Sequence, residues 1–332
     1  MRQMRHAHAL RLLSLLLVLL QGVPLLCGCS RTSAPIEATE EEMRAVGNVG
    51  DYEVAYDEYR FAVLTCRGML TEEYGESFLQ SADAKERILE NVLSNITYNY
   101  AVLTLCAEVG ILPDNETLLE AVQQKVDKTV EELGSRRKYR RYLEENGLTD
   151  RLYRFNLMVD LMQNELFYVY VDDLGLIESE DAEVYDIILK EFINVSHIYV
   201  SKATEGAYER ICQAQSRLQN GEDFAALVAE YNEDDGQTEG GDCIPRGYMS
   251  EPYENAAFSL GVGSISDVVE DSNGYYIIRR GTVDTGYVLM HFDTLADRYR
   301  SYAFLDMIEK EQAKLQLVFN SYGASLDALT LS

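Results

Sequence analysis

Cysteine and histidine are the residue types in this chain that most readily hold a metal, so their spacing is the first chemical signal in the sequence. The 332 residues include six cysteines and four histidines. They form no CxxC pair and no cysteine–histidine pattern of a zinc site. We therefore expect no metal site. Four of the cysteines are widely scattered along the chain, and the sequence leaves open whether they form two disulfides or stay free thiols. They are Cys66, Cys106, Cys212 and Cys243.

A short segment near residue 240 differs in character from the rest of the chain. Residues 240–249 read GGDCIPRGYM and contain three glycines, a proline, an arginine and a methionine, although the whole chain has only five prolines. Glycine and proline clustered in this way favour turns over a continuing helix. We interpret the glycines as turns between strands and Pro245–Met249 as one wall of a binding site.

Two segments that flank this region have the alternating pattern of β-strands. Side chains alternate between the two faces of a strand, so His197 shares a face with Val195 and Tyr199. The later segment YYIIRRG carries Tyr276 and Ile278 on one face. Short strands separated by helices of ten to fifteen residues indicate an α+β layer, with helices over a small sheet.

About 90 residues, starting near Phe192, resemble a parvulin-type peptidyl-prolyl isomerase domain. No single motif is diagnostic, but the landmarks of that family occur in the expected order. They are Ser196-His197-Ile198, Gly221–Ala225, Tyr231, Gly240-Gly241-Asp242, Arg246–Met249, Glu254–Phe258 and Gly274–Ile278.

The resemblance implies an activity and a set of site residues. The activity is rotation about the peptide bond before proline, which has a barrier of about 18–20 kcal/mol. An apolar slot for the prolyl ring, with polar groups that favour a twisted amide, is sufficient, and no nucleophile or cofactor is required. The implied residues are His197, Asp234 and Tyr276 as catalytic groups, and Cys243, Met249, Tyr253 and Phe258 as substrate-binding groups.

The sequence departs from the family pattern at several of these positions. Tyr276 stands where the family has a second histidine, and its hydroxyl can still hydrogen-bond to His197. Tyr253 replaces the usual phenylalanine, Cys243 replaces the usual leucine, and the loop after Asp242 is two residues shorter. These departures leave two functions open. One is a foldase that isomerises X–Pro bonds, and the alternative is a catalytically degenerate holdase that binds unfolded clients.

Each site residue also has a purely structural interpretation. His197 can be a histidine that serves the hydrogen bonding of the sheet, and Asp234 can be a capping acid in the loop NEDDGQ. Met249 and Tyr253 can be ordinary packing residues. The sequence does not decide between these interpretations and the catalytic ones.

The first residues predict export and a lipid anchor. An apolar run over Leu12–Leu20 follows three basic residues, Arg2, Arg5 and Arg11. The run is too short for an ordinary membrane-spanning helix and is typical of a signal peptide. The run ends in a motif that resembles the bacterial lipobox, with Cys29 as the lipidated residue. A plain secretory signal is the alternative. A lipidated terminus would hold the protein to the membrane by acyl chains.

The remaining segments are mainly helical and resemble the helical domain of SurA-like and PrsA-like extracytoplasmic chaperones. In that family a C-terminal helix returns to the helical domain, so the isomerase domain is an insertion. The predicted fold is therefore α+β, with a small antiparallel sheet and flanking helices inserted in a mainly α-helical domain. The sequence predicts the following division of the chain: a signal peptide at residues 1–28, a flexible tether at 29–45, a helical chaperone domain at 46–190, an isomerase domain at 191–282, and a C-terminal helix at 283–332 that returns to the chaperone domain.

Charge limits the partners of such a protein. The chain has 56 acidic and 29 basic side chains, a net charge of −27. Such a surface repels nucleic acid, and by the same argument it disfavours electrostatic binding to an anionic membrane surface. It is compatible with solubility alone or with attraction of cationic, unfolded clients. We expect the partners to be unfolded or partly folded secreted polypeptides, and no feature of the sequence indicates an oligomeric state.

Overall fold

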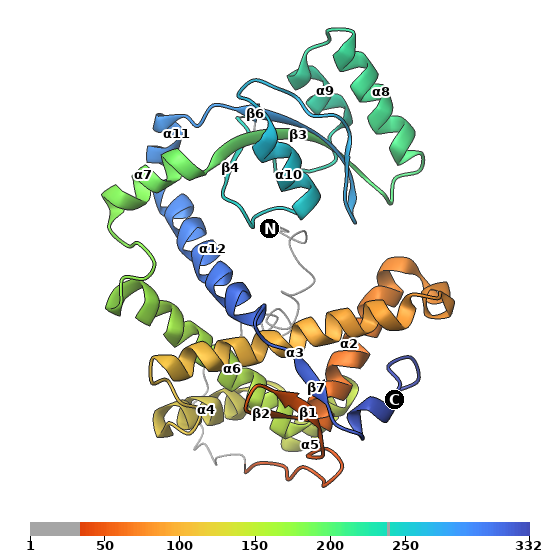
Figure 1. The fold of residues 1–332 in the computed structure, drawn as a ribbon, viewed down its shortest axis with the longest axis vertical. Coiled ribbons are helices and arrows are strands. Elements are labelled where there is room, and N and C mark those ends of the chain that lie inside the picture. The colour runs from red at the N-terminus through yellow and green to blue at the C-terminus, as the bar shows by residue number, and fades with distance from the viewer. Residues whose placement is uncertain (1–33, 238–239) are drawn as a thin grey trace. The chain divides into compact units, whose positions relative to one another are not determined.

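The computed structural model describes residues 34–237 and 240–332, which divide into two compact units (Figure 1). The helical unit contains residues 34–173 and 307–332, and the sheet unit contains residues 174–306. The sheet unit is therefore an insertion in the helical one, as the predicted fold class requires. The predicted signal peptide, Cys29 and the start of the tether lie outside the described residues.

The helical unit is built from helices and one small sheet. Its sheet has the antiparallel order β2-β1-β7, so a strand from the end of the chain completes a hairpin from its beginning. The elements are β1 (Ala45–Val49), β2 (Tyr52–Ala55), α2 (Tyr56–Tyr74), η2 (Glu76–Gln80), α3 (Ala84–Glu108), α4 (Glu116–Glu132), α5 (Arg136–Glu145), α6 (Asp150–Tyr168), η3 (Val169–Asp173), β7 (Leu317–Phe319) and η4 (Gly323–Ser325).

Side-chain caps set where three of these helices begin. Asn115 accepts hydrogen bonds from the first turn of α4, Ser135 from that of α5, and Thr149 from that of α6. Such caps satisfy backbone N–H groups that have no partner inside the helix. The return of the C-terminal strand depends on Gly47, because a Cβ there would lie 2.4 Å from the carbonyl oxygen of Val318.

A buried group of charged side chains joins the start of α2 to the start of α6. Asp57 accepts hydrogen bonds from the Thr149 hydroxyl at 2.5 Å and from Arg151 Nε at 3.0 Å. Arg151 also lies 3.6 Å from Glu58, whose Oε1 is buried without a hydrogen-bond partner among the described residues. Burial raises the pKa of Glu58 to about 7, against lowering contributions from Tyr100 and Arg151.

The sheet unit has a four-stranded antiparallel sheet of order β4-β3-β6-β5. Helices α8 and α9 pack on one face of it and α10 on the other (Figure 1). Its elements are α7 (Asp181–Glu191), β3 (Ile193–Ser201), α8 (Ala207–Gln219), α9 (Phe224–Tyr231), β4 (Asp242–Ile244), α10 (Glu251–Ser259), β5 (Val269–Glu270), β6 (Gly274–Gly281) and α11 (Thr285–Met290).

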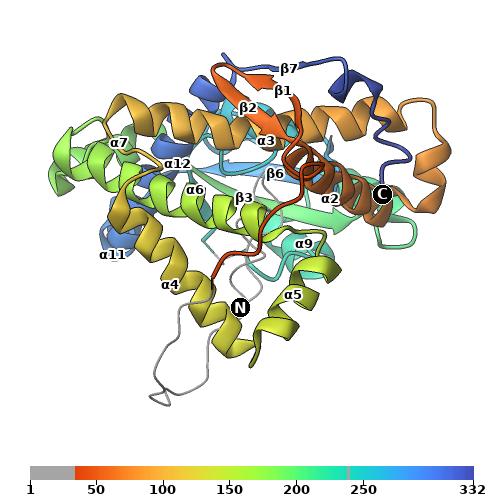
Figure 2. The same ribbon diagram turned by 90° about the horizontal axis from the view of Figure 1, so that it is seen from below.

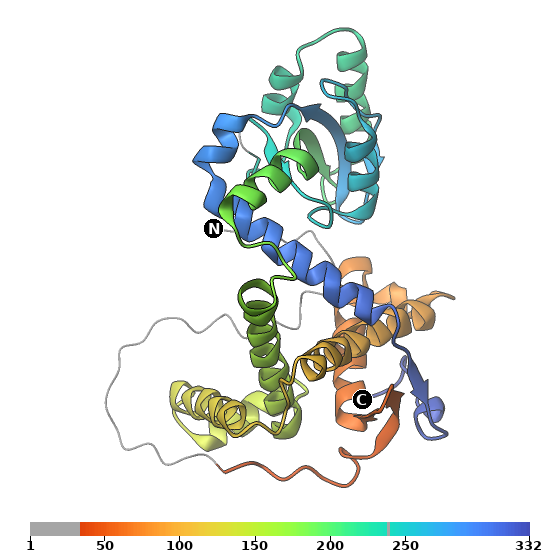
Figure 3. The same ribbon diagram turned by 60° about the vertical axis from the view of Figure 1, so that its left-hand side comes forward.

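One last helix, α12 (Phe292–Gln312), continues from the sheet unit into the helical unit (blue in Figure 3). Within the sheet unit, Leu295 and Ala296 of α12 pack against α7. Within the helical unit, the side-chain amide of Gln312 donates to the carbonyl oxygen of Ser94 at 2.8 Å. The two ends of the helix are thus each packed into a different unit.

Two further properties bear on the sequence predictions. Cys66, Cys106, Cys212 and Cys243 are all free cysteines, so the alternative of unpaired thiols holds. Over residues 34–237 and 240–332, no helix combines the length and apolar character that crossing a bilayer requires.

The buried Glu58 generates a prediction about stability and pH. Its folded-state pKa of about 7 lies above the ordinary value of 4.5, so the folded state binds this proton more tightly than the unfolded chain. The free energy of unfolding therefore falls as pH rises from about 4.5 to about 7, by roughly 3 kcal/mol at most. We expect Glu58→Gln to remove this pH dependence and to raise stability at pH 8.

Urea unfolding of the wild type and Glu58→Gln at pH 5 and pH 8 measures the effect. Asp57→Asn is the matched comparison, because it removes the carboxylate that pairs with Arg151 and is expected to destabilise the protein instead. An unchanged slope of stability against pH in Glu58→Gln would contradict the assignment.

Candidate functional site

His197 lies in the middle of β3, on the face of the sheet that α10 covers. It shares that face with Tyr199, and Tyr276 of β6 contributes to the same cluster. Ile198 and Ile277 point to the opposite face, beneath α8 and α9. The alternation predicted from the sequence is therefore confirmed. It gives the sheet one face that contains His197 and several tyrosines, and an opposite face on which Ile198, Val200 and Ile277 form an apolar core beneath α8 and α9.

A loop covers the part of β3 that β4 does not reach. β4 pairs only with Ile193–Val195. Farther along, the Gln237 side chain accepts from the backbone N–H of His197 and donates to its carbonyl oxygen at 2.9 Å. The Asn232 side chain accepts from the backbone N–H of Tyr199 at 2.9 Å. The loop side chains thus continue the hydrogen bonding of the sheet edge, and this fixes Asp234 between them.

Both ring nitrogens of His197 have a partner. Nε2 lies 3.2 Å from Oδ2 of Asp234, and Nδ1 lies 3.0 Å from the hydroxyl of Tyr253. A carboxylate only accepts hydrogen bonds, so Nε2 carries the proton that faces it. In the neutral ring Nδ1 is then an acceptor, and the Tyr253 hydroxyl donates to it. The result is a directed chain from Tyr253 through His197 to Asp234.

Asp234 has contacts that fit both interpretations of this residue. Its Oδ1 accepts from the backbone N–H of Gly236 at 2.8 Å, so the residue does cap its own loop. Its Oδ2 faces His197, and 41% of the side chain remains exposed. Asp234 is thus a group that contacts the buried histidine and also meets solvent.

Tyr276 differs from the sequence prediction in its hydrogen-bonding partner. The sequence left open a hydrogen bond from its hydroxyl to His197, whereas the Tyr253 hydroxyl is the one that lies 3.0 Å from the ring nitrogen Nδ1. The Tyr276 ring instead packs edge-on against His197, with centroids 5.6 Å apart. Burial raises the pKa of Tyr276, and so do the charge of Asp271 and a hydrogen bond to it. Asp271, on the turn that precedes β6, is thus the charged group that acts on Tyr276.

Asp271 is a buried residue that sequence reasoning missed. Its carboxylate accepts from the Ser250 hydroxyl at 2.9 Å and from the backbone N–H groups of Asn273 and Gly274 at 2.8 and 3.0 Å. It therefore links the start of α10 to the β5–β6 turn. Its position in the sequence DSNG is typical of a turn, and this signal alone did not indicate the link to α10.

The start of α10 positions Met249. Glu254 is buried, and its Oε1 accepts from the backbone N–H of Met249 at 3.0 Å. Met249 and Phe258 are half-buried and pack against the cluster that contains Tyr253. Tyr253 itself has no exposed surface. In this conformation, Met249 and Phe258 are therefore the predicted slot residues that keep surface for a ligand.

Cys243 is separated from the other predicted slot residues. It packs in a different cluster, with Ile188 and Phe192 from α7 and its C-terminal end and with Leu295 of α12. The next residue, Ile244, joins the cluster around Tyr253. Adjacent residues of a strand face opposite sides, so the two cannot share one pocket. Burial raises the pKa of the Cys243 thiol to about 12.

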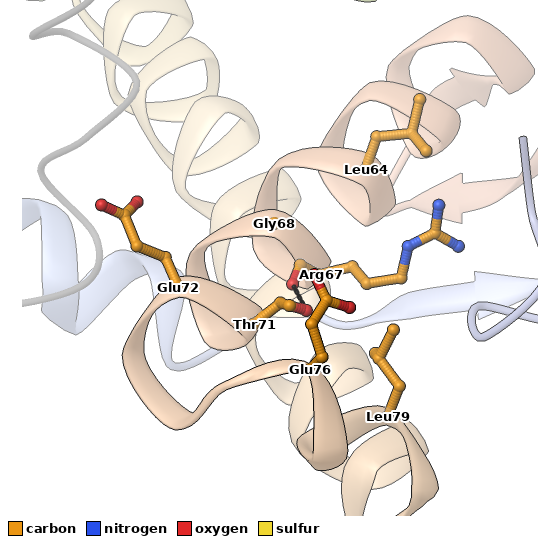
Figure 4. Close-up of a pocket in the computed structure, with 7 residues that line it drawn as sticks. All are labelled: Leu64, Arg67, Gly68, Thr71, Glu72, Glu76 and Leu79. Atoms are coloured by element: carbon orange, nitrogen blue, oxygen red, sulfur yellow. Dashed lines mark hydrogen bonds between the residues drawn. The ribbon is translucent and has the colours of Figure 1, made fainter.

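The helical unit has a hollow of its own, of about 520 Å³, along α2 and η2 (Figure 4). Arg67 donates from this region to the carbonyl oxygens of Ala328 and Leu329, at 3.4 and 3.0 Å. The lining mixes apolar and charged side chains and contains no histidine or cysteine. The lining residues are Leu64, Arg67, Gly68, Thr71, Glu72, Glu76 and Leu79.

Two family models match the chain. A SurA-like N-terminal domain matches residues 1–167, and a PPIC-type PPIase domain, also described as rotamase, matches residues 192–281. The second match contains His197, Asp234 and the whole of the surrounding network. The first covers half of the chain.

Two curated relatives are foldases by name. The chain is 31% identical to the foldase protein PrsA of Geobacillus kaustophilus, over 60% of this chain and 72% of that one. It is 32% identical to the foldase protein PrsA of Caldanaerobacter subterraneus, over 55% of this chain and 56% of that one. A solved structure of the peptidylprolyl isomerase PrsA from Bacillus anthracis is 20% identical, over 66% and 96% of the two chains, with a TM-score of 0.36.

The contact between Tyr253 and His197 generates a prediction. Tyr253→Phe removes the hydroxyl and leaves a buried ring nitrogen without its partner, which is expected to cost about 1–2 kcal/mol of stability. Tyr248→Phe is the matched control, because Tyr248 packs at the edge of the same cluster. Denaturant unfolding of both variants measures the difference.

A double-mutant cycle isolates the pair from other effects of the substitution. The coupling between Tyr253→Phe and His197→Ala is expected to exceed about 0.5 kcal/mol, as for residues in direct contact. Additive effects of the two substitutions would show that the hydrogen bond does not contribute.

Proposed function

The chain belongs to the PrsA family of foldases, and we propose that it acts outside the cytoplasm to isomerise X–Pro bonds in unfolded secreted polypeptides. The chain of hydrogen bonds from Tyr253 through His197 to Asp234 is the observation that supports this most directly. It joins a partly exposed carboxylate to the cluster around Tyr253, against which two half-buried apolar side chains, Met249 and Phe258, also pack. This is the combination that rotation of a prolyl amide requires.

We propose that the prolyl ring of a client packs against Met249 and Phe258. Rotation about the X–Pro bond breaks the resonance of the amide, so the carbonyl oxygen loses part of its negative charge in the twisted state. A carboxylate beside that carbonyl repels the planar amide more than the twisted one. Asp234 in this position lowers the barrier by differential stabilisation, without a covalent step.

His197 acts through Asp234 in this proposal. Its Nε2–H group holds the carboxylate in one orientation, and Tyr253 holds the imidazole in the required tautomer. Tyr276 packs against the ring and, with Asp271, keeps the turn before β6 in place. Cys243 has no role in the reaction, because it faces another cluster.

A holdase that binds unfolded segments without isomerising them is the second candidate. The complete burial of Tyr253 is the reason to test it, because a prolyl ring contacts that side chain only after a neighbouring group moves. The two functions differ in one respect that can be measured. A holdase does not accelerate the cis–trans exchange of a short peptide, whereas an isomerase does.

A protease-coupled assay on X–Pro peptides tests the proposed activity. We expect Asp234→Ala and His197→Ala to lower kcat/KM by more than tenfold, because each breaks the network. We expect Met249→Ala to lower it by more than fivefold through loss of contact with the prolyl ring. Cys243→Ala is the matched control and is expected to retain the wild-type rate.

Equal inactivity of the wild type and of a His197→Ala/Asp234→Ala variant on several X–Pro peptides would favour the holdase instead. A Cys243→Ala variant that loses as much activity as Met249→Ala would contradict the proposed slot. The folded state of each variant is checked by its unfolding midpoint, so that loss of activity is not confused with loss of fold.

We also propose that Cys29 carries a lipid and holds the mature protein at the membrane surface. The support is the sequence alone: a short apolar run, then a leucine and a glycine at the positions of a lipobox before Cys29. Acyl chains anchor a protein without a spanning helix. The anchor would keep the foldase where exported chains emerge.

Metabolic labelling with a fatty acid analogue in a bacterial host tests the anchor. The wild type is expected to incorporate the label and to fractionate with membranes, because the diacylglyceryl group is attached to the thiol. Cys29→Ala is expected to lose both properties, whereas Cys27→Ala is expected to keep them. Labelling that follows Cys27, or neither cysteine, would contradict the assignment.

A further inference from the structure

Helix α5 has a charge pattern opposite to that of the chain. Five of its first six residues are basic, in a protein with a net charge of −27. The side chains of Tyr139 and Leu143 are buried, and all five basic residues are exposed. The five basic residues are Arg136, Arg137, Lys138, Arg140 and Arg141.

This pattern is not explained by the stability of the helix. The N-terminal end of a helix carries partial positive charge, so acidic residues belong in its first turn and basic residues in its last. α5 has no acidic residue in its first turn and no basic residue in its last, where Glu144 and Glu145 stand instead. The order of charges is therefore unfavourable for the helix dipole.

Ion pairs do not account for the cluster either. Arg141 lies 3.5 Å from Glu145, in a pair whose side chains are 68% and 66% exposed. Such a pair contributes little. In the described part of the chain, Arg137, Lys138 and Arg140 have no ion pair. Three cations thus remain available to an external partner.

The position of α5 indicates what that partner is. Arg136, at its first position, donates to the carbonyl oxygens of Ala34 and Pro35. The backbone N–H of Ile36 donates to Asp150 at 3.2 Å, at the start of α6. The first described residues therefore run beside the start of α5 (red in Figure 2).

This contact limits the distance between α5 and the proposed lipid anchor. Ala34 follows Cys29 by five residues, and five residues span at most about 18 Å. If Cys29 carries the lipid, as proposed above, Ala34 lies within about that distance of the acylated residue. The guanidinium of Arg136 contacts Ala34 and thus lies close to the headgroups.

We propose that α5 is a docking surface for anionic phospholipid headgroups and acts as a second membrane signal beside the lipid at Cys29. Basic residues near an anionic surface each strengthen binding by about fivefold, and stable anchoring commonly combines a lipid with a basic patch. The net charge of −27 disfavours binding to an anionic membrane only if the charge is spread evenly over the protein surface. With α5 toward the membrane, the cationic cluster meets the headgroups first.

Vesicle sedimentation tests this inference separately from lipidation. The protein is the chain from Ser30 onward, which lacks Cys29 and retains every described contact. The vesicles contain either 30% phosphatidylglycerol in phosphatidylcholine or phosphatidylcholine alone. The test variant is Arg137→Gln/Lys138→Gln/Arg140→Gln/Arg141→Gln, which leaves Arg136 in place. The control variant removes the same number of charges elsewhere: Lys85→Gln/Lys190→Gln/Lys202→Gln/Lys314→Gln.

We expect the wild type and the control variant to bind the anionic vesicles and to be released at 0.5 M salt, because the Debye length then becomes short. The test variant is expected to bind more than tenfold more weakly. Equal binding to both kinds of vesicle, or an equal loss in the control variant, would overturn the proposal. So would binding to soluble polyphosphate without binding to anionic vesicles, because the partner would then be a polyanion rather than a lipid surface.

Discussion

The candidate site depends on one physical requirement, which is that both nitrogens of a buried imidazole must have partners. His197 is only 7% exposed, and an unpaired nitrogen there would cost about 1–3 kcal/mol. Asp234 and Tyr253 meet this requirement from opposite sides. Each of them is in turn held by a separate part of the sheet unit, Asp234 by the loop along β3 and Tyr253 by α10. The geometry of the site is therefore a consequence of the whole α+β layer.

The same requirement explains why a tyrosine is tolerated in an apolar slot. The Tyr253 hydroxyl would be a poorly solvated polar group if it had no partner, and His197 provides one. Tyr276 and Asp271 form a second polar pair beside the first. The resemblance to parvulins suggested a single altered network, whereas in the structure Tyr253, and not Tyr276, completes the network around His197. The proposed chemistry requires only that a charged carboxylate, that of Asp234, is held in position beside the prolyl amide. Such a rearrangement of the tyrosines is compatible with it.

Much of the fold could be predicted from the sequence, because its signals are local. The alternation in β3 and β6 follows from a short pattern, and the insertion of one unit in the other follows from family landmarks that occur in order. The contacts of the site are not local. Tyr253 meets His197 across 56 residues, and no pattern in either segment indicates that pair. β4 has only three residues, too few for alternation to show which way Cys243 faces. For α5, the total charge concealed a local cluster of opposite sign.

The central claim is that the surface beside His197 receives a prolyl residue while Tyr253 and Asp234 hold the imidazole. Nuclear magnetic resonance of protein labelled at the histidine ring nitrogens and methionine methyl groups, titrated with an X–Pro peptide, tests it most directly. The account predicts a His197 ring protonated at Nε2, with its signal and the Met249 methyl signal shifting together as peptide is added. A ring protonated only at Nδ1, or peptide-induced shifts confined to residues of other clusters, would contradict it.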